Sequence, residues 1–198
     1  MRELQKGLWH WEAPHPEWEP SAGGPDGWGP DVSCYAIDDG ERLLLLDPLA
    51  LPAELEELAR SRETAVVLTN AWHERDARDL AERLGAQVFV PPADGPDRLV
   101  GQPYAAGDRL PVGVEARPGG EPPFDHILWV ESHRAIVIGD SLIDNGTGLT
   151  LFDRWIPEGQ TREEVLERLR PLLELPVEIV LPTHGAPTER AALERALT

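Results

Sequence analysis

The sequence contains few of the residues that several common kinds of protein require. Cys34 is the only cysteine, so neither an internal disulfide nor a cluster of thiolate metal ligands can form. The longest apolar runs have the length of strands, as in residues 43–46 and 135–139, and are too short for a membrane-spanning helix. The N-terminus lacks the apolar stretch of a secretory signal. We therefore expect a cytoplasmic protein.

Positive charge is also scarce. The 198 residues include 18 Lys and Arg against 36 Asp and Glu, which gives a net charge of −18, and Lys6 is the only lysine. An acidic surface repels phosphate backbones and anionic lipids, so we expect neither nucleic-acid nor membrane partners. The acidic residues are spread over helix faces and turns, which is typical of a solvated surface. A small molecule, as ligand or substrate, is the expected partner.

The chain is long enough for one sizeable core, and we predict a single domain over residues 1–198. Residues 1–30 form a lead-in rich in Trp, Pro and Gly, whose indoles predict packing on the body of the protein. This lead-in is also a candidate contact for a homodimer. Residues 31–188 form the expected core.

Within the core, strand-like and helix-like segments alternate. Strands are expected at 31–37, 42–48, 64–69, 86–92, 126–140 (turning at 131–134) and 177–185. Helices are expected at 52–62, 74–85, 161–171 and 188–197, and Thr161 with Glu164 forms a capping box. Strand, helix and strand at this spacing predict parallel crossovers, and hence a mixed α/β domain.

Five segments in order resemble the landmarks of the metallo-β-lactamase superfamily. They are VSCYAIDDGERLLLLDP, VVLTNAWHERDA, AAGDRLPVGVEARPGG, AIVIGDSLI and VLPTHGAP. The resemblance covers about residues 31–188. It implies a four-layered αβ/βα sandwich with a metal site between two sheets, and the activity of a hydrolase.

The metal-binding motif of that family is largely replaced in this chain. In the family, the strand that ends in Thr leads into His-x-His-x-Asp-His. Aligning Thr69 with that Thr places these residues at the ligand positions: Asn70, Trp72, Glu74 and Arg75. A further family His corresponds to Gly120, whereas the bridging Asp and the last His correspond to Asp140 and His184.

Chemistry decides what the replacements can do. The Trp72 indole is only a donor and Gly120 has no side chain, so neither binds a metal. Asn70 offers one weak neutral oxygen. The guanidinium of Arg75 stays protonated and has no acceptor. We therefore expect no standard two-metal centre.

One hypothesis is an atypical site for a single metal ion. His73, Asp140 and His184 would be its ligands and catalytic residues, and Glu74 is a fourth candidate ligand. One zinc, iron or manganese ion there would activate water to attack an ester, thioester, lactone or amide. The alternative for His73 is an exposed or capping position in the first turn of a helix.

The other hypothesis is a metal-free protein that binds a small ligand or an interaction partner. Arg75 would replace the metal against Asp140, with Trp72 and Asn70 beside the ligand. The alternative for Arg75 is a solvated helix residue paired with Asp79.

Other polar residues allow more than one role. Asp47 ends a buried strand, either as a turn cap or as a group facing the cleft. Asp125 and His126 could be an acid–base pair, but neighbours on a strand point to opposite faces. His10 and His15 belong to the lead-in, which either lies over the cleft or packs on the body.

Overall fold

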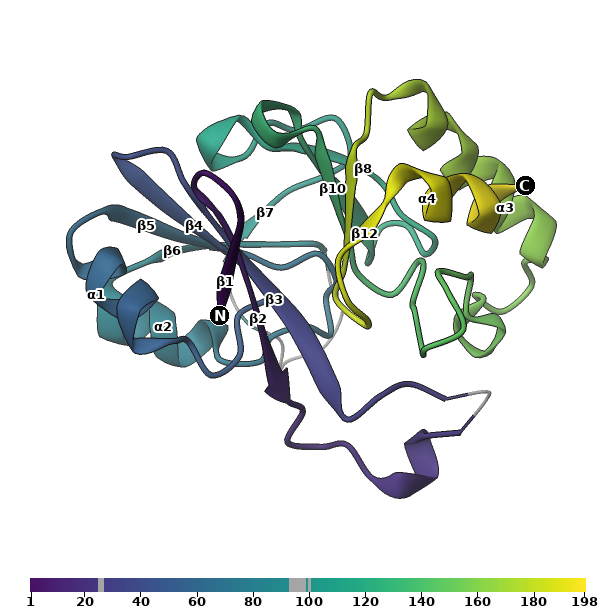
Figure 1. Ribbon diagram of the computed structural model, residues 1–198, viewed down its shortest axis with the longest axis horizontal. Coiled ribbons are helices and arrows are strands. Elements are labelled where there is room, and N and C mark those ends of the chain that lie inside the picture. Colours follow the sequence, from purple (N-terminus) through teal and green to yellow (C-terminus); the bar gives the residue numbers. More distant parts are fainter. Residues whose placement is uncertain (25–26, 93–98, 100) are drawn as a thin grey trace.

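The computed structural model describes residues 1–24, 27–92, 99 and 101–198. Two β-sheets pack face to face, and a pair of helices covers the outer face of each sheet (Figure 1). This is the predicted four-layered αβ/βα sandwich. None of the helices in the described part of the chain is long and apolar enough to span a membrane.

The larger sheet has seven strands in sequence order. They are β1 (Arg2–Gln5), β2 (Leu8–Pro14), β3 (Asp31–Asp38), β4 (Arg42–Leu46), β5 (Glu63–Val67), β6 (Gln87–Val90) and β7 (Gln102–Pro103). Strands β1 to β4 pair antiparallel, and β4 to β7 pair parallel. The parallel pair β5–β6 is the crossover expected from the sequence, and β4–β5 is a second parallel pair.

The smaller sheet has five strands in the order β12-β11-β10-β9-β8. They are β8 (Glu115–Pro118), β9 (His126–Val130), β10 (Ala135–Ile138), β11 (Ile179–Pro182) and β12 (Thr188–Glu189). Only β10 and β11 pair parallel in this sheet, so their C-terminal ends lie side by side.

Helices α1 (Ala53–Arg60) and α2 (Ala77–Leu84) cover the larger sheet, and α3 (Arg162–Leu169) and α4 (Arg190–Leu197) cover the smaller one (Figure 1). The capping box at α3 is confirmed: Glu164 N donates to Thr161 Oγ1 at 3.3 Å, and Thr161 N donates to Glu164 Oε2 at 2.7 Å.

Strand β4 shows why this sequence needs four layers. Leu43 and Leu45 pack under α1 and α2, whereas Leu44 and Leu46 pack between the sheets. All four side chains are fully buried. Successive strand residues point to opposite faces, so a continuous leucine run is stable only where both faces are covered.

The first part of the lead-in is a β-hairpin within the larger sheet. Strands β1 and β2 pair with each other, and β2 pairs with β3 from Leu8↔Ile37 to Pro14↔Asp31. Residues 2–14 are therefore part of the sheet, where the sequence suggested a segment packed on it. In the structure Leu8, Trp11 and Ala13 of β2 are buried and Glu12 is exposed, but neighbouring tryptophans and a proline interrupt the apolar–polar alternation by which a sequence indicates a strand.

Candidate metal centre

Strand register brings Asp140 and His184 together. Ile138 pairs with Pro182 at the ends of the parallel strands β10 and β11. Continuing the same register by two residues places Asp140 opposite His184, on the same side of the sheet. Thr183 N still donates to Ile138 O at 2.8 Å, which keeps the two chains paired up to this point.

His73 reaches the same place from the larger sheet. It lies in the turn between β5 and α2, where His73 N donates to Asn70 O at 3.1 Å. The following Arg75 has a φ of 41°, which is not helical. Helix α2 therefore begins at Ala77, three residues after the predicted start, and His73 turns inward. Its side chain is buried rather than exposed in a helical turn.

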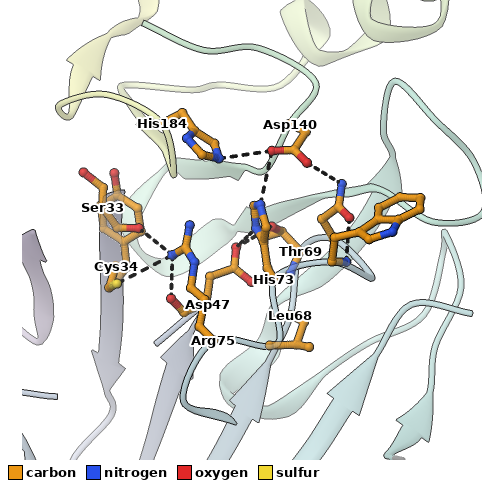
Figure 2. A network of polar contacts seen from close by, with 12 residues as sticks. Ser33, Cys34, Asp47, Leu68, Thr69, His73, Arg75, Asp140 and His184 are labelled. Atoms are coloured by element: carbon orange, nitrogen blue, oxygen red, sulfur yellow. Dashed lines mark hydrogen bonds and ion pairs between the residues drawn. The ribbon is translucent and has the colours of Figure 1, made fainter. Parts of the chain in front are cut away.

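The imidazoles of His73 and His184 both point toward one carboxylate oxygen of Asp140 (Figure 2). Asp140 Oδ1 lies 3.1 Å from His73 Nε2 and 3.3 Å from His184 Nε2. One ligand atom from each residue lies within 4.8 Å of the others. Two imidazole nitrogens and one carboxylate oxygen are the donor set of catalytic zinc and of non-haem iron sites.

Electrostatics fix the protonation of this group. Burial lowers the pKa of His73, but the carboxylates of Asp140 and Asp47 raise it more, to about 9. For Asp140, burial raises the pKa, and the two histidines more than compensate, so the net shift is downward. Burial lowers the pKa of His184.

Asp47 supports His73 from behind. It is fully buried and accepts hydrogen bonds from Thr69 N at 2.8 Å, from the Thr69 hydroxyl and from His73 Nδ1 at 3.0 Å. A carboxylate on Nδ1 keeps the proton there and leaves the Nε2 lone pair for a metal. Asp47 thus both caps the turn and orients His73. Sequence reasoning considered the two roles only as alternatives.

Asn70 holds the other oxygen of Asp140. Its Nδ2 donates to Asp140 Oδ2 at 3.0 Å, and its Oδ1 accepts from Trp72 N at 2.9 Å. Both ends of the amide are therefore used, and the Trp72 bond fixes which end faces the carboxylate. The residue at the first family ligand position acts as a support for Asp140.

The predicted pairing of Arg75 with Asp140 is wrong. Arg75 Nη1 donates to Asp47 O at 2.7 Å and to Ser33 O at 3.2 Å, and contacts Cys34 Sγ at 3.6 Å (Figure 2). Carbonyl groups at the ends of β3 and β4 attract the guanidinium away from the carboxylate.

The helix-surface alternative for Arg75 is also wrong. The side chain is partly buried, and the acid of that alternative, Asp79, pairs with Arg83 instead. Nε and Nη2 of Arg75 are buried and have no partner in the described residues.

Glu74 lies outside the metal-ligand group. Its carboxylate pairs with Arg78 Nε at 2.7 Å, one helical turn further on. The turn that directs His73 inward directs Glu74 toward the helix surface. Glu74 as a ligand is therefore not supported by the structure.

Two tryptophans flank His184. The ring centroids of Trp28 and Trp155 lie 4.9 Å and 5.3 Å from that of His184, both in edge arrangements. Trp28 also meets His15 at 5.2 Å, so the end of the lead-in lies against the cleft. His10 does not lie against the cleft. Its Nε2 lies 2.9 Å from Ser33 Oγ, which donates to Gly185 O. Trp155 had no distinctive signal in the sequence.

A cavity of about 490 Å³ opens on Asp140. One side of its lining is apolar and consists of Leu151, Trp155, Ile156, Pro157 and Val165. Trp72, Asn70 and Gly120 also line it, so three of the five replaced family positions face the cavity. A space of this size holds a small organic molecule.

Asp125 and Ser141 form the buried base of the cavity. Ser141 Oγ donates to Asp125 Oδ2, and Gly120 N donates to both side chains. Burial, with a smaller effect of Asp140, raises the pKa of Asp125 to about 7. His126 turns away and contacts Tyr104, with the rings tilted and their centroids 4.9 Å apart, so no acid–base pair with Asp125 forms.

The residues present fit one ion. The imidazoles of His73 and His184 converge with the carboxylate of Asp140, and the buried Asp47 supports His73. The cavity leaves Asp140 open on one side. A second ion would lack ligands, because Trp72 and Gly120 offer none and Asn70 is engaged. The Nδ1 atom of His184 is buried and has no partner in the part of the chain that the structure describes.

Comparison with known proteins identifies the fold. No protein-family profile and no curated protein sequence matches the chain. Among solved structures, a metallo-β-lactamase family protein from Thermus thermophilus has a TM-score of 0.66 at 17% identity, covering 98% of this chain and 79% of that one.

Two further structures agree. A metallo-β-lactamase from Hirschia baltica gives a TM-score of 0.67 at 17% identity, covering 99% of this chain and 94% of that one. TTHA1623, solved in a di-iron-bound form, gives a TM-score of 0.62 at 24% identity, covering 90% of this chain and 98% of that one. The chain therefore has the metallo-β-lactamase fold.

Proposed function

We propose that the protein is a hydrolase of small acyl compounds that works with a single metal ion held by His73, Asp140 and His184. The observation that carries the proposal is the convergence of three ligand atoms within 4.8 Å of one another, one of them from Asp140, which lines a cavity. The carboxylate of Asp47 behind His73 adds the support that metal-binding histidines generally have.

The supports of Asp140 favour one ion over two. Asn70 occupies Oδ2, so Oδ1 is the oxygen left for the metal. Arg75 places a permanent positive charge near His73 and His184, and this charge opposes protonation of both imidazoles. The same repulsion would act on a second dication.

The bound ion, which we expect to be zinc, iron or manganese, would supply Lewis acidity and lower the pKa of water. His73 and His184 hold it through Nε2, and Asp140 Oδ1 balances part of its charge. Asp47 retains the proton on His73 Nδ1. The apolar side of the cavity orients the substrate and excludes bulk water. Esters, thioesters, lactones and amides are the substrate classes that this arrangement accommodates.

One observation favours a second candidate, a metal-free binding protein. Without an ion, the His73 imidazolium bridges Asp47 and Asp140, so the three ligand side chains satisfy one another. In that case the cavity would bind a small molecule without chemistry. The version in which Arg75 pairs with Asp140 is not retained.

The test is metal content together with hydrolysis. Protein dialysed without chelator is analysed for metals, and a panel of small esters, thioesters, lactones and amides is assayed. We expect metal and hydrolysis in the wild type, and loss of both in His184→Ala. The control is His133→Ala, since His133 lies in a surface turn and bonds to Lys6 O. Absence of metal, even after soaking in excess zinc, would refute the hydrolase and leave the binding protein.

A further inference from the structure

The mouth of the cavity displays an aromatic side chain to solvent. Among the large hydrophobic residues that the structure describes, only Met1 and Trp72 are exposed, and 47% of Trp72 is accessible. Its ring contacts Phe124 edge-on, with centroids 5.5 Å apart, and Trp155 lines the same cavity. An exposed indole beside a cavity is typical of a ligand-binding surface.

Two carboxylates outside the metal-ligand group also line the cavity. They are Glu121 and Glu158, in addition to the buried Asp125. In the described ranges, neither Glu121 nor Glu158 forms an ion pair with a basic side chain. Arg154 is the one basic residue among the lining residues.

Glu121 is half-buried at the surface of the cavity, so a cation that enters the cavity stabilises its carboxylate.

We propose that the substrate carries an ammonium group on an apolar body, at a distance from the bond that is cleaved. The proposal rests on the hydrolase assignment and names the substrate class of the same cavity. The carbonyl group lies toward His73, Asp140 and His184, and the ammonium group lies among Trp72, Glu121 and Glu158.

Two interactions favour the cation. Indole faces attract ammonium groups, an attraction that a neutral isostere lacks. The glutamates add attraction and repel a carboxylate in the same position. The apolar side of the cavity, formed by Leu151 and its neighbours, holds the hydrocarbon part in either case.

The experiment uses three probes without a hydrolysable bond, so it does not depend on catalysis. Choline and 3,3-dimethylbutan-1-ol have the same shape and differ by one positive charge, and 2-hydroxyethanesulfonate carries an anionic group in the position of the ammonium group. Their binding to the full-length protein as purified is measured by ligand-observed NMR titration. We expect choline to bind about tenfold more tightly than the alcohol, and the anion to bind most weakly.

Matched variants locate the effect. Glu121→Gln and Glu158→Gln should each reduce the advantage of choline about threefold and leave the alcohol unchanged. Glu57→Gln removes the same charge from an exposed position of α1 and should have no effect.

Equal binding of choline and the alcohol, tightest binding of the anion, or no binding of any probe would overturn the proposal. So would equal effects of all three variants. Failure of the hydrolase proposal would appear instead as absence of metal or hydrolysis, which these titrations do not measure.

Discussion

The support of His73 by Asp47 makes a specific prediction for Asp47→Asn. Asparagine has the same shape and tolerates the φ of 44° at this position. Its amide nitrogen, however, is a donor where Asp47 Oδ2 now accepts from Thr69 Oγ1 and His73 Nδ1. The His73 proton would then move to Nε2, the atom that faces Asp140.

The expected magnitude follows from these contacts. Loss of a carboxylate behind a histidine ligand costs about 10–100-fold in metal affinity, or about 1.4–2.7 kcal/mol. The mismatched buried donors should also lower the free energy of unfolding by about 1–3 kcal/mol.

Zinc affinity is measured by competition with a chromophoric chelator, and stability by urea unfolding. Asp39→Asn is the matched control, because Asp39 caps the turn at Glu41 and Arg42 on the surface. Wild-type zinc affinity in Asp47→Asn, with the fold intact, would refute the proposed support of His73.

Three further predictions concern stability. Arg75→Met leaves the carbonyls of Ser33 and Asp47 without their donor and should lower the free energy of unfolding by about 1–3 kcal/mol in urea; an unchanged value would mean that Arg75 is solvated. Burial lowers the pKa of His126 from 6.5 to about 4, so the unfolded state binds more protons between these pH values and stability is lost as pH falls. Between pH 8 and pH 5 the free energy of unfolding of His126→Phe should therefore fall by about 2 kcal/mol less than that of the wild type. Parallel pH profiles of the two proteins in urea unfolding would contradict this. Thr161→Ala removes the capping box of α3 and should cost about 1 kcal/mol, whereas no change in the thermal midpoint would contradict the capping contribution.

Much of the fold could be predicted because its signals are local. Apolar runs such as residues 43–46 and 64–68, and the cap at Thr161, specify strands and a helix start from neighbouring residues alone. The order of the segments resembled the metallo-β-lactamase superfamily, and that resemblance implied the four-layered sandwich. The N-terminal hairpin was missed because tryptophans and a proline obscured the alternation along β2.

The site depended on geometry that the sequence does not display. Whether His73 or Arg75 faces Asp140 is decided by one left-handed residue in the turn, and the sequence pattern there favoured a helix from Glu74. The supporting role of Asp47 needs a contact across 26 residues. Trp155 reaches His184 through a loop with no recognisable motif.

The most direct test of the account is the number of metal ions per chain in the wild type, His73→Ala and Glu74→Ala. The account predicts one ion in the wild type, none in His73→Ala, and one in Glu74→Ala, because Glu74 pairs with Arg78 outside the site. Two ions in the wild type, or an ion retained in His73→Ala and lost in Glu74→Ala, would contradict it.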